Sequence, residues 1–299
     1  MYDQVAQNRR RSMVLIAGFF LFTALTAIAV SFGLGFGTPG IIIAVLIAAS
    51  AAIMGYWKSD RVALAVSRAY PADETTFARY HNVVEGLCIA SGLPKPRLYI
   101  VHDVAPNAFA TGRNPKHGAV AVTTGLLETM NRVELEGVLA HELSHIKNYD
   151  ILVSTLAVVM VGVVTLVADI SLRFSLLSGS RRRKAEDSMG LVLVVVGLLL
   201  AIIGPIIAKL MQMAITRRRE SLADLSAVQM TRYPPGLISA LQKLEAEPTV
   251  VRSGSRATAH MWIEDPMAQT PSEGRMSRLN RMFNTHPPIA ERIAALREL

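Results

Sequence analysis

The stretch His141-Glu142-Leu143-Ser144-His145 decides how the rest of this chain is interpreted. On a helix, residues four apart lie on one face, so both histidines can turn an imidazole toward the same metal ion. Glu142 then points beside that ion, where its carboxylate can take a proton from a bound water. This spacing is typical of a catalytic zinc site. The competing interpretation is an amphipathic helix that carries two hydrogen-bonded histidines.

A catalytic zinc usually has three protein ligands and one open position, so the sequence must supply a third ligand. Glu220 is the candidate, because it lies in a helical run just after the last apolar segment. Asp224 follows four residues later on the same face and can accept the free N–H of a ligand histidine. Taken alone, these charges would be read as a surface ion-pair stripe with the arginines at 217–219.

Long apolar runs show that the chain is a membrane protein. It has 299 residues, of which 51% are hydrophobic and 18% charged. Four runs approach the length of about 20 residues that a spanning helix needs, namely 13–34, 40–57, 151–172 and 189–208. This composition excludes a disordered chain, and a lone cysteine, Cys88, excludes a disulfide scaffold.

The apolar runs divide the chain into four predicted segments. These are an N-terminal transmembrane hairpin (1–57), a first polar stretch with the metal-binding helix (58–150), a second membrane hairpin (151–208) and a second polar stretch (209–299). The site residues come from both polar stretches, so we expect the two to form one domain that the second hairpin interrupts.

The first polar stretch predicts a mixed, mainly helical α+β domain. Apolar spacing favours helices over 73–91 and 133–148. β-branched and aromatic residues favour strands over 97–102 and 119–123. Gly92 is expected to cap the first helix.

The basic residues fit membrane topology better than nucleic-acid binding. The net charge is +8, but no nucleic-acid motif is present and the basic residues gather near membrane edges. With the N-terminus inside, 12 Lys and Arg lie near the cytoplasmic membrane ends, against five in the outer loop 173–188. Those five leave two alternatives for the second hairpin, which either crosses the bilayer or dips into it. We expect a multi-pass protein of the bacterial cytoplasmic (inner) membrane, with lipid and no nucleic acid as partners.

Five motifs, two of which contain the candidate site residues described above, carry a family resemblance. They cover residues 107–115, 119–127, 141–148, 219–224 and 285–293. With the paired N-terminal anchors, they make the chain resemble the HtpX-type membrane zinc metalloproteases, a gluzincin group related to the CaaX prenyl proteases. The resemblance implies a zincin-type domain with one Zn2+ per chain. It also implies that His141, His145 and Glu220 bind the metal and that Glu142 is the catalytic carboxylate.

Two of these motifs have open interpretations. Asn107, Ala108, Phe109 and Ala110 lie between the two expected strands, and form either an open edge to which a peptide substrate adds as a strand or a plain loop. His286 precedes two prolines, with Arg292 on the next helix. In one interpretation, one of these two residues stabilises the oxyanion of the tetrahedral intermediate. In the other, it is a buried cap that packs the C-terminal helix.

The predicted function is a zinc-dependent endopeptidase that cuts cytoplasmic parts of misfolded or damaged membrane proteins. Glu142 takes a proton from the attacking water and delivers it to the leaving amine. The alternative is a non-catalytic, zinc-stabilised membrane adaptor that binds unfolded segments, but such an adaptor would not need Glu142. Charges around the motif helix argue against an intramembrane protease, and featureless apolar runs argue against a transporter. A loop within 253–275 is expected to cover the resting cleft.

Overall fold

The computed structural model describes residues 10, 13–14, 17–18, 21, 24–25, 28, 37–152, 154–155, 217–246, 261–263 and 287–299. Most of the predicted runs 13–34 and 151–172, and all of 189–208, lie outside these residues. A search of the described residues found no helix with the length and apolar character needed to span a membrane.

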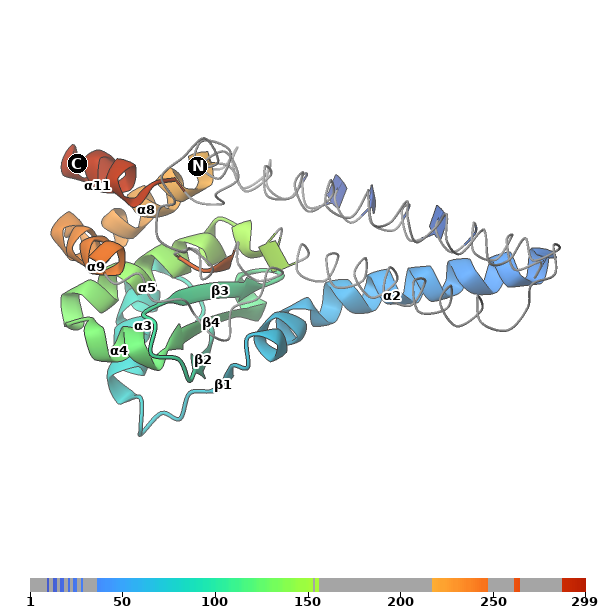
Figure 1. The fold of residues 1–299 in the computed structure, drawn as a ribbon, viewed down its shortest axis with the longest axis horizontal. Helices are drawn as coiled ribbons and strands as arrows, with labels where there is room; N and C mark the ends of the chain where they lie inside the picture. The colour runs from blue at the N-terminus through green and yellow to red at the C-terminus, as the bar shows by residue number, and fades with distance from the viewer. Residues whose placement is uncertain are drawn as a thin grey trace, which may run out of the picture.

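The domain is built around a small sheet with strand order β1-β2-β4-β3 (Figure 1). The strands are β1 (Tyr70–Pro71), β2 (Arg97–Val101), β3 (Ala108–Gly112) and β4 (Gly118–Thr123). β2 and β4 run parallel, while β3 pairs antiparallel with β4 from Ala108 opposite Val122 to Gly112 opposite Gly118. β3 is therefore an edge strand of the sheet.

Helices cover one face of this sheet. They are α3 (Ala78–Ser91), α4 (Thr124–Thr129), α5 (Arg132–Lys147), α8 (Arg217–Thr231), α9 (Pro234–Ala246) and α11 (Ile289–Arg297). The main hydrophobic core joins sheet residues such as Ile100 and Val122 to Leu139 and Leu143 of α5. Side chains alternate across a strand, so Ala121 points to the opposite face, where a second core includes residues of α2.

The long helix α2 (Gly37–Val66) reaches the sheet with its C-terminal end and extends away from the domain (Figure 1). It contains the predicted apolar run 40–57. Large apolar side chains along it are exposed, among them Leu46, Ile53 and Trp57.

Most of the expected elements of the first polar stretch are confirmed, with two differences. Gly92 ends α3 in the left-handed region, with φ of 70°. The helix expected from residue 73 begins only at Ala78, because the Asp73 carboxylate accepts hydrogen bonds from the backbone and hydroxyl groups of Thr75 and Thr76 and forms a turn there. Of residues 107–110, left open between a strand edge and a loop, 108–110 belong to β3.

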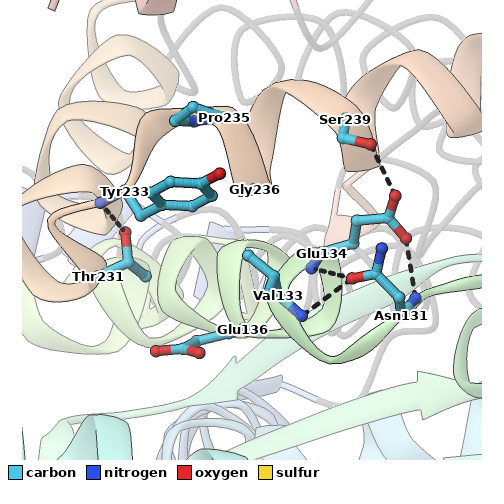
Figure 2. Close-up of a pocket in the computed structure, with 9 residues that line it drawn as sticks. All are labelled: Asn131, Val133, Glu134, Glu136, Thr231, Tyr233, Pro235, Gly236 and Ser239. Carbon is cyan, nitrogen blue, oxygen red and sulfur yellow. Dashed lines mark hydrogen bonds between the residues drawn. The ribbon is translucent and has the colours of Figure 1, made fainter.

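The start of α5 is fixed by a capping box, which sets the register of the metal-binding motif. Asn131 accepts from the N–H groups of Val133 and Glu134, and Glu134 accepts in return from the N–H of Asn131. Ser239 of α9 donates to the same Glu134 at 2.6 Å (Figure 2). These residues line a cavity of about 600 Å³ that includes none of the predicted metal ligands.

Close packing of α5 against α9 supports the motif from behind. A Cβ added at Gly137 would lie 2.8 Å from the backbone of Leu237, and one at Gly236 would lie 2.8 Å from the carbonyl oxygen of Val133. Real Cβ atoms do not come this close to a backbone, so the two helices need glycine at both positions. Gly137 is one turn before His141 and therefore helps to set where that residue lies.

Candidate active site

The three predicted ligands, two on α5 and one on α8, lie close together. Nε2 of His141 and Nε2 of His145 lie 3.1 Å apart. The two carboxylate oxygens of Glu220 lie 3.5 Å and 3.7 Å from these nitrogens. The packing of α8 on α5 brings these groups together, and Ala223 and Ala227 of α8 are fully buried in the protein interior.

A carboxylate–arginine pair contacts His141 on the side of the ring that faces away from the other ligands. Oδ1 of Asp224 lies 2.8 Å from Nδ1 of His141, on the ring edge opposite the cluster. Arg292 of α11 donates to both carboxylate oxygens of Asp224, at 2.9 Å and 2.7 Å. All three side chains are buried. The expected partnership of Asp224 with a ligand histidine therefore has the required geometry, and Arg292 adds a third member.

His145 has a second pair of this kind, which the sequence did not predict. Oδ2 of Asp150 lies 3.4 Å from Nδ1 of His145, and Arg219 lies 3.7 Å from the other oxygen of Asp150. Tyr149 makes this possible, because its φ of 60° lies in the left-handed region and turns the chain just after α5. The only sequence signal was an acidic residue five positions beyond His145.

Glu142 follows His141 on α5 and is 1% exposed. Its charge helps raise the pKa of Tyr80 on α3, for which burial is the main cause. Burial and the nearby His141 lower the pKa of His145, but Asp150, Glu220 and Glu142 outweigh them and raise it. Glu142 therefore lies within electrostatic range of the ligand cluster.

The charges around the cluster orient His141 for metal binding, but they also leave its ring protonated at neutral pH until a metal displaces the Nε2 proton. Burial and Arg292 lower the pKa of His141, but Asp224 and Glu220 outweigh them and raise that pKa to about 9. Burial raises the pKa of Asp224, but Arg292 and His141 hold it at about 2. Asp224 thus stays ionised at neutral pH and attracts the Nδ1 proton of His141, which leaves Nε2 of that ring to bind a metal.

The spacing of the three ligands fits zinc. Tetrahedral zinc with bonds of about 2.0–2.1 Å places its ligand atoms about 3.3 Å apart. The two Nε2 atoms lie 3.1 Å apart, each lies 3.5 Å or 3.7 Å from a different oxygen of Glu220, and one ligand atom from each residue lies within 4.8 Å of the others, which leaves room for zinc after small side-chain rotations. Two imidazoles and one carboxylate are also the donor set of many catalytic zinc sites, with a fourth position left for water or substrate.

The remaining predicted site residues lie in different places. Asn107 immediately precedes β3, and its side chain and backbone bond to Ala108 and Thr123. Ala108, Phe109 and Ala110 belong to that edge strand. His286 lies outside the described residues, and its catalytic role stays a prediction. Arg292 donates to Asp224 behind His141, and its role, left open between oxyanion stabilisation and packing, stays a prediction.

Comparison with known proteins decides the family. A model of peptidase family M48 matches residues 74–299, which include every ligand of the cluster. The chain belongs to peptidase family M48. This membership identifies it as a metalloprotease, and zinc dependence is typical of the family.

Curated relatives agree with the M48 assignment. A protein named "Protease HtpX homolog" from Caldanaerobacter subterraneus is 40% identical over 301 residues, covering 100% of this chain and 98% of the relative. Another of the same name from Streptococcus gordonii is 40% identical over 304 residues and covers 100% of both chains. These matches confirm the HtpX-type resemblance.

The fold is also similar to a solved M48 neighbour. The crystal structure of S. mikatae Ste24p superposes with a TM-score of 0.50 at 16% identity, covering 99% of this chain and 67% of that one. This likeness shows the fold alone. It confirms a mainly helical domain with a small sheet.

Proposed function

We propose that the chain is a membrane-anchored zinc endopeptidase that cuts cytoplasmic parts of misfolded or damaged membrane proteins. The observation that carries this proposal is the cluster of His141, His145 and Glu220 beside Glu142 in a member of peptidase family M48. Zinc bound there would polarise the scissile carbonyl and activate a water molecule.

The residues of the chain have separate roles in this proposal. His141, His145 and Glu220 hold the metal, and Asp224 fixes the tautomer and orientation of His141. Glu142 accepts a proton from the attacking water and passes it to the leaving amine. Asp150 orients His145 in the same way as Asp224 orients His141.

The membrane arrangement is part of the proposal. The hairpins 1–57 and 151–208 anchor the domain, whose halves 58–150 and 209–299 face the cytoplasm. The distribution of Lys and Arg supports this orientation. The exposed apolar side chains along α2 support the anchor itself. Because the motif helix ends at Lys147, close to the start of the second hairpin, the site would lie near the membrane surface and within reach of membrane-protein loops.

The substrate class is tested with the full chain in liposomes. The substrates are a membrane protein with a destabilised cytoplasmic loop, its stable parent and the same loop as a soluble fusion. We expect cleavage within the destabilised loop, with little cutting of the parent. Equal cutting of the soluble fusion would contradict a preference for membrane proteins, and cleavage only within membrane spans would contradict a cytoplasmic site.

A further inference from the structure

A short segment of the chain, residues 261–263, pairs with the open edge of β3. Trp262 forms an antiparallel bridge with Phe109, and the N–H of Ile263 donates to the carbonyl oxygen of Ala108 at 2.9 Å. In Figure 1 this segment runs between β3 and α5. An extended peptide that adds to a sheet edge makes the same backbone contacts. The segment therefore occupies the edge that the sequence suggested for substrate.

The side chain of Trp262 fills an apolar site on the sheet face that α2 covers. It is fully buried, and its ring lies 4.6 Å from that of Phe109 in an edge-to-face arrangement. The rest of this core is built mainly from small side chains, including Ala63 of α2 and Ala121 of β4. Small residues around one large ring leave a volume that only a bulky apolar side chain fills.

The indole of Trp262 leaves its N–H group, which is buried, without a hydrogen-bond partner among the described residues. A buried donor in that state costs about 1–3 kcal/mol. A Phe, Leu or Met side chain would enter the same site without this cost, so a peptide that carries one can compete with the segment 261–263.

Most of the metal cluster is closed to solvent in this arrangement, although the side chain of His145 is 16% exposed. His141, Glu142 and Glu220 are each 1% exposed. A polypeptide must reach these residues to be cut, so part of the covering structure has to move before catalysis. The segment 261–263 lies on the edge that the substrate needs, which makes it a part that must leave.

We propose that the Trp262 site is a substrate subsite that selects a bulky apolar side chain, and that the segment 261–263 occupies it as a substrate mimic at rest. The substrate lies antiparallel to β3, with its large apolar residue between Phe109 and α2. This selects extended segments rich in bulky apolar residues, which unfolded membrane proteins expose. The inference rests on the proposed function and names the chemistry of its substrate.

The binding test uses tryptophan fluorescence of the full chain in detergent. The chain has two tryptophans, so Trp57→Phe leaves Trp262 as the single reporter. The variant Glu142→Gln is added to prevent cleavage. A blocked ten-residue peptide with one central Phe is compared with the same peptide carrying Ser. We expect the Phe peptide to shift Trp262 emission to longer wavelength and to bind about tenfold or more tightly, from the apolar area of one Phe.

The functional test uses active enzyme. Trp262→Ala should raise kcat/KM for the Phe peptide, because the apolar site is vacated and the segment 261–263 loses its ring contact with Phe109. Phe109→Ala should reduce the discrimination between the Phe and Ser peptides, whereas Tyr56→Ala on α2, outside this core, should not. Zinc content and thermal unfolding of each variant show whether the fold is intact.

The outcomes separate this inference from the proposed function. Hydrolysis with equal rates for both peptides and no response from Trp262 would overturn the subsite and leave the protease assignment standing. If only the Phe peptide shifts the emission of Trp262, and the enzyme that keeps Glu142 hydrolyses neither peptide, the subsite is supported and the protease assignment is contradicted. If Phe109→Ala is unfolded, the fluorescence comparison of the two peptides still decides.

Discussion

Replacing the two carboxylates behind the histidines should weaken zinc binding to different extents. Asp224 lies 2.8 Å from His141, which is the length of a charge-assisted hydrogen bond, and its position is fixed by Arg292. Asp150 lies 3.4 Å from His145, which is longer than an ordinary hydrogen bond. Loss of such partners typically costs 10–100-fold in metal affinity.

The structure places the two variants at opposite ends of that range. Asp224→Asn should lower zinc affinity by about 100-fold, or about 2.7 kcal/mol, and Asp150→Asn by about 10-fold, or about 1.4 kcal/mol. The assay is competition for zinc with a chromophoric chelator at fixed pH. Asp60→Asn is the control, because Asp60 also pairs with an arginine, Arg97, but lies on α2.

A structural loss must be separated from a loss of metal affinity. Asp224→Asn leaves the guanidinium of Arg292 buried with a weaker partner, so thermal unfolding is measured at saturating zinc. The Co2+-loaded variants give a second readout, because their visible spectra report ligand geometry. Equal affinity losses for the two variants, or a larger loss for Asp150→Asn, would refute the reasoning from distances.

Three further predictions follow from single residues. Gly137→Ala should lower the free energy of unfolding by about 1–3 kcal/mol, because the new Cβ would meet the backbone of Leu237 at 2.8 Å. Gly86→Ala has open space around it and should raise that free energy by about 0.5–1 kcal/mol. Chemical denaturation of both variants measures the two changes. Burial raises the pKa of the Cys88 thiol to about 11, so the folded protein should resist a thiol reagent at pH 8, and fast labelling would contradict this. The pKa of His141 is raised to about 9, so this residue is protonated at pH 7 before metal binds. Zinc binding should therefore release protons and weaken as the pH falls. Calorimetry in two buffers of different ionisation enthalpy measures the number of protons released.

The sequence predicted the parts of the site that depend on local spacing. The i, i+4 relation of His141 and His145 fixes both on one face of α5, and the same relation joins Glu220 to Asp224 on α8. Helix geometry therefore predicts two ligands on α5. The need for a third ligand then singles out Glu220, which shares a face of α8 with Asp224, the carboxylate that orients His141.

The parts that the sequence did not predict depend on the path of the chain in space. Asp150 reaches His145 only because Tyr149 adopts a left-handed conformation, which nothing in its side chain favours. The pairing of Trp262 with Phe109 joins residues 153 positions apart, so no local pattern indicates it. A covering loop was expected within 253–275, and the pairing of 261–263 with β3 is consistent with that expectation.

The most direct test of the central claim is proteolysis of an unfolded polypeptide by the full chain purified in detergent. Wild type and Glu142→Gln are stripped of metal and reloaded with zinc, and zinc content is measured in both. The account predicts that zinc restores cutting in the wild type only, although both forms bind one zinc per chain. One zinc bound in each form without cutting by either would contradict the protease and favour a zinc-stabilised adaptor.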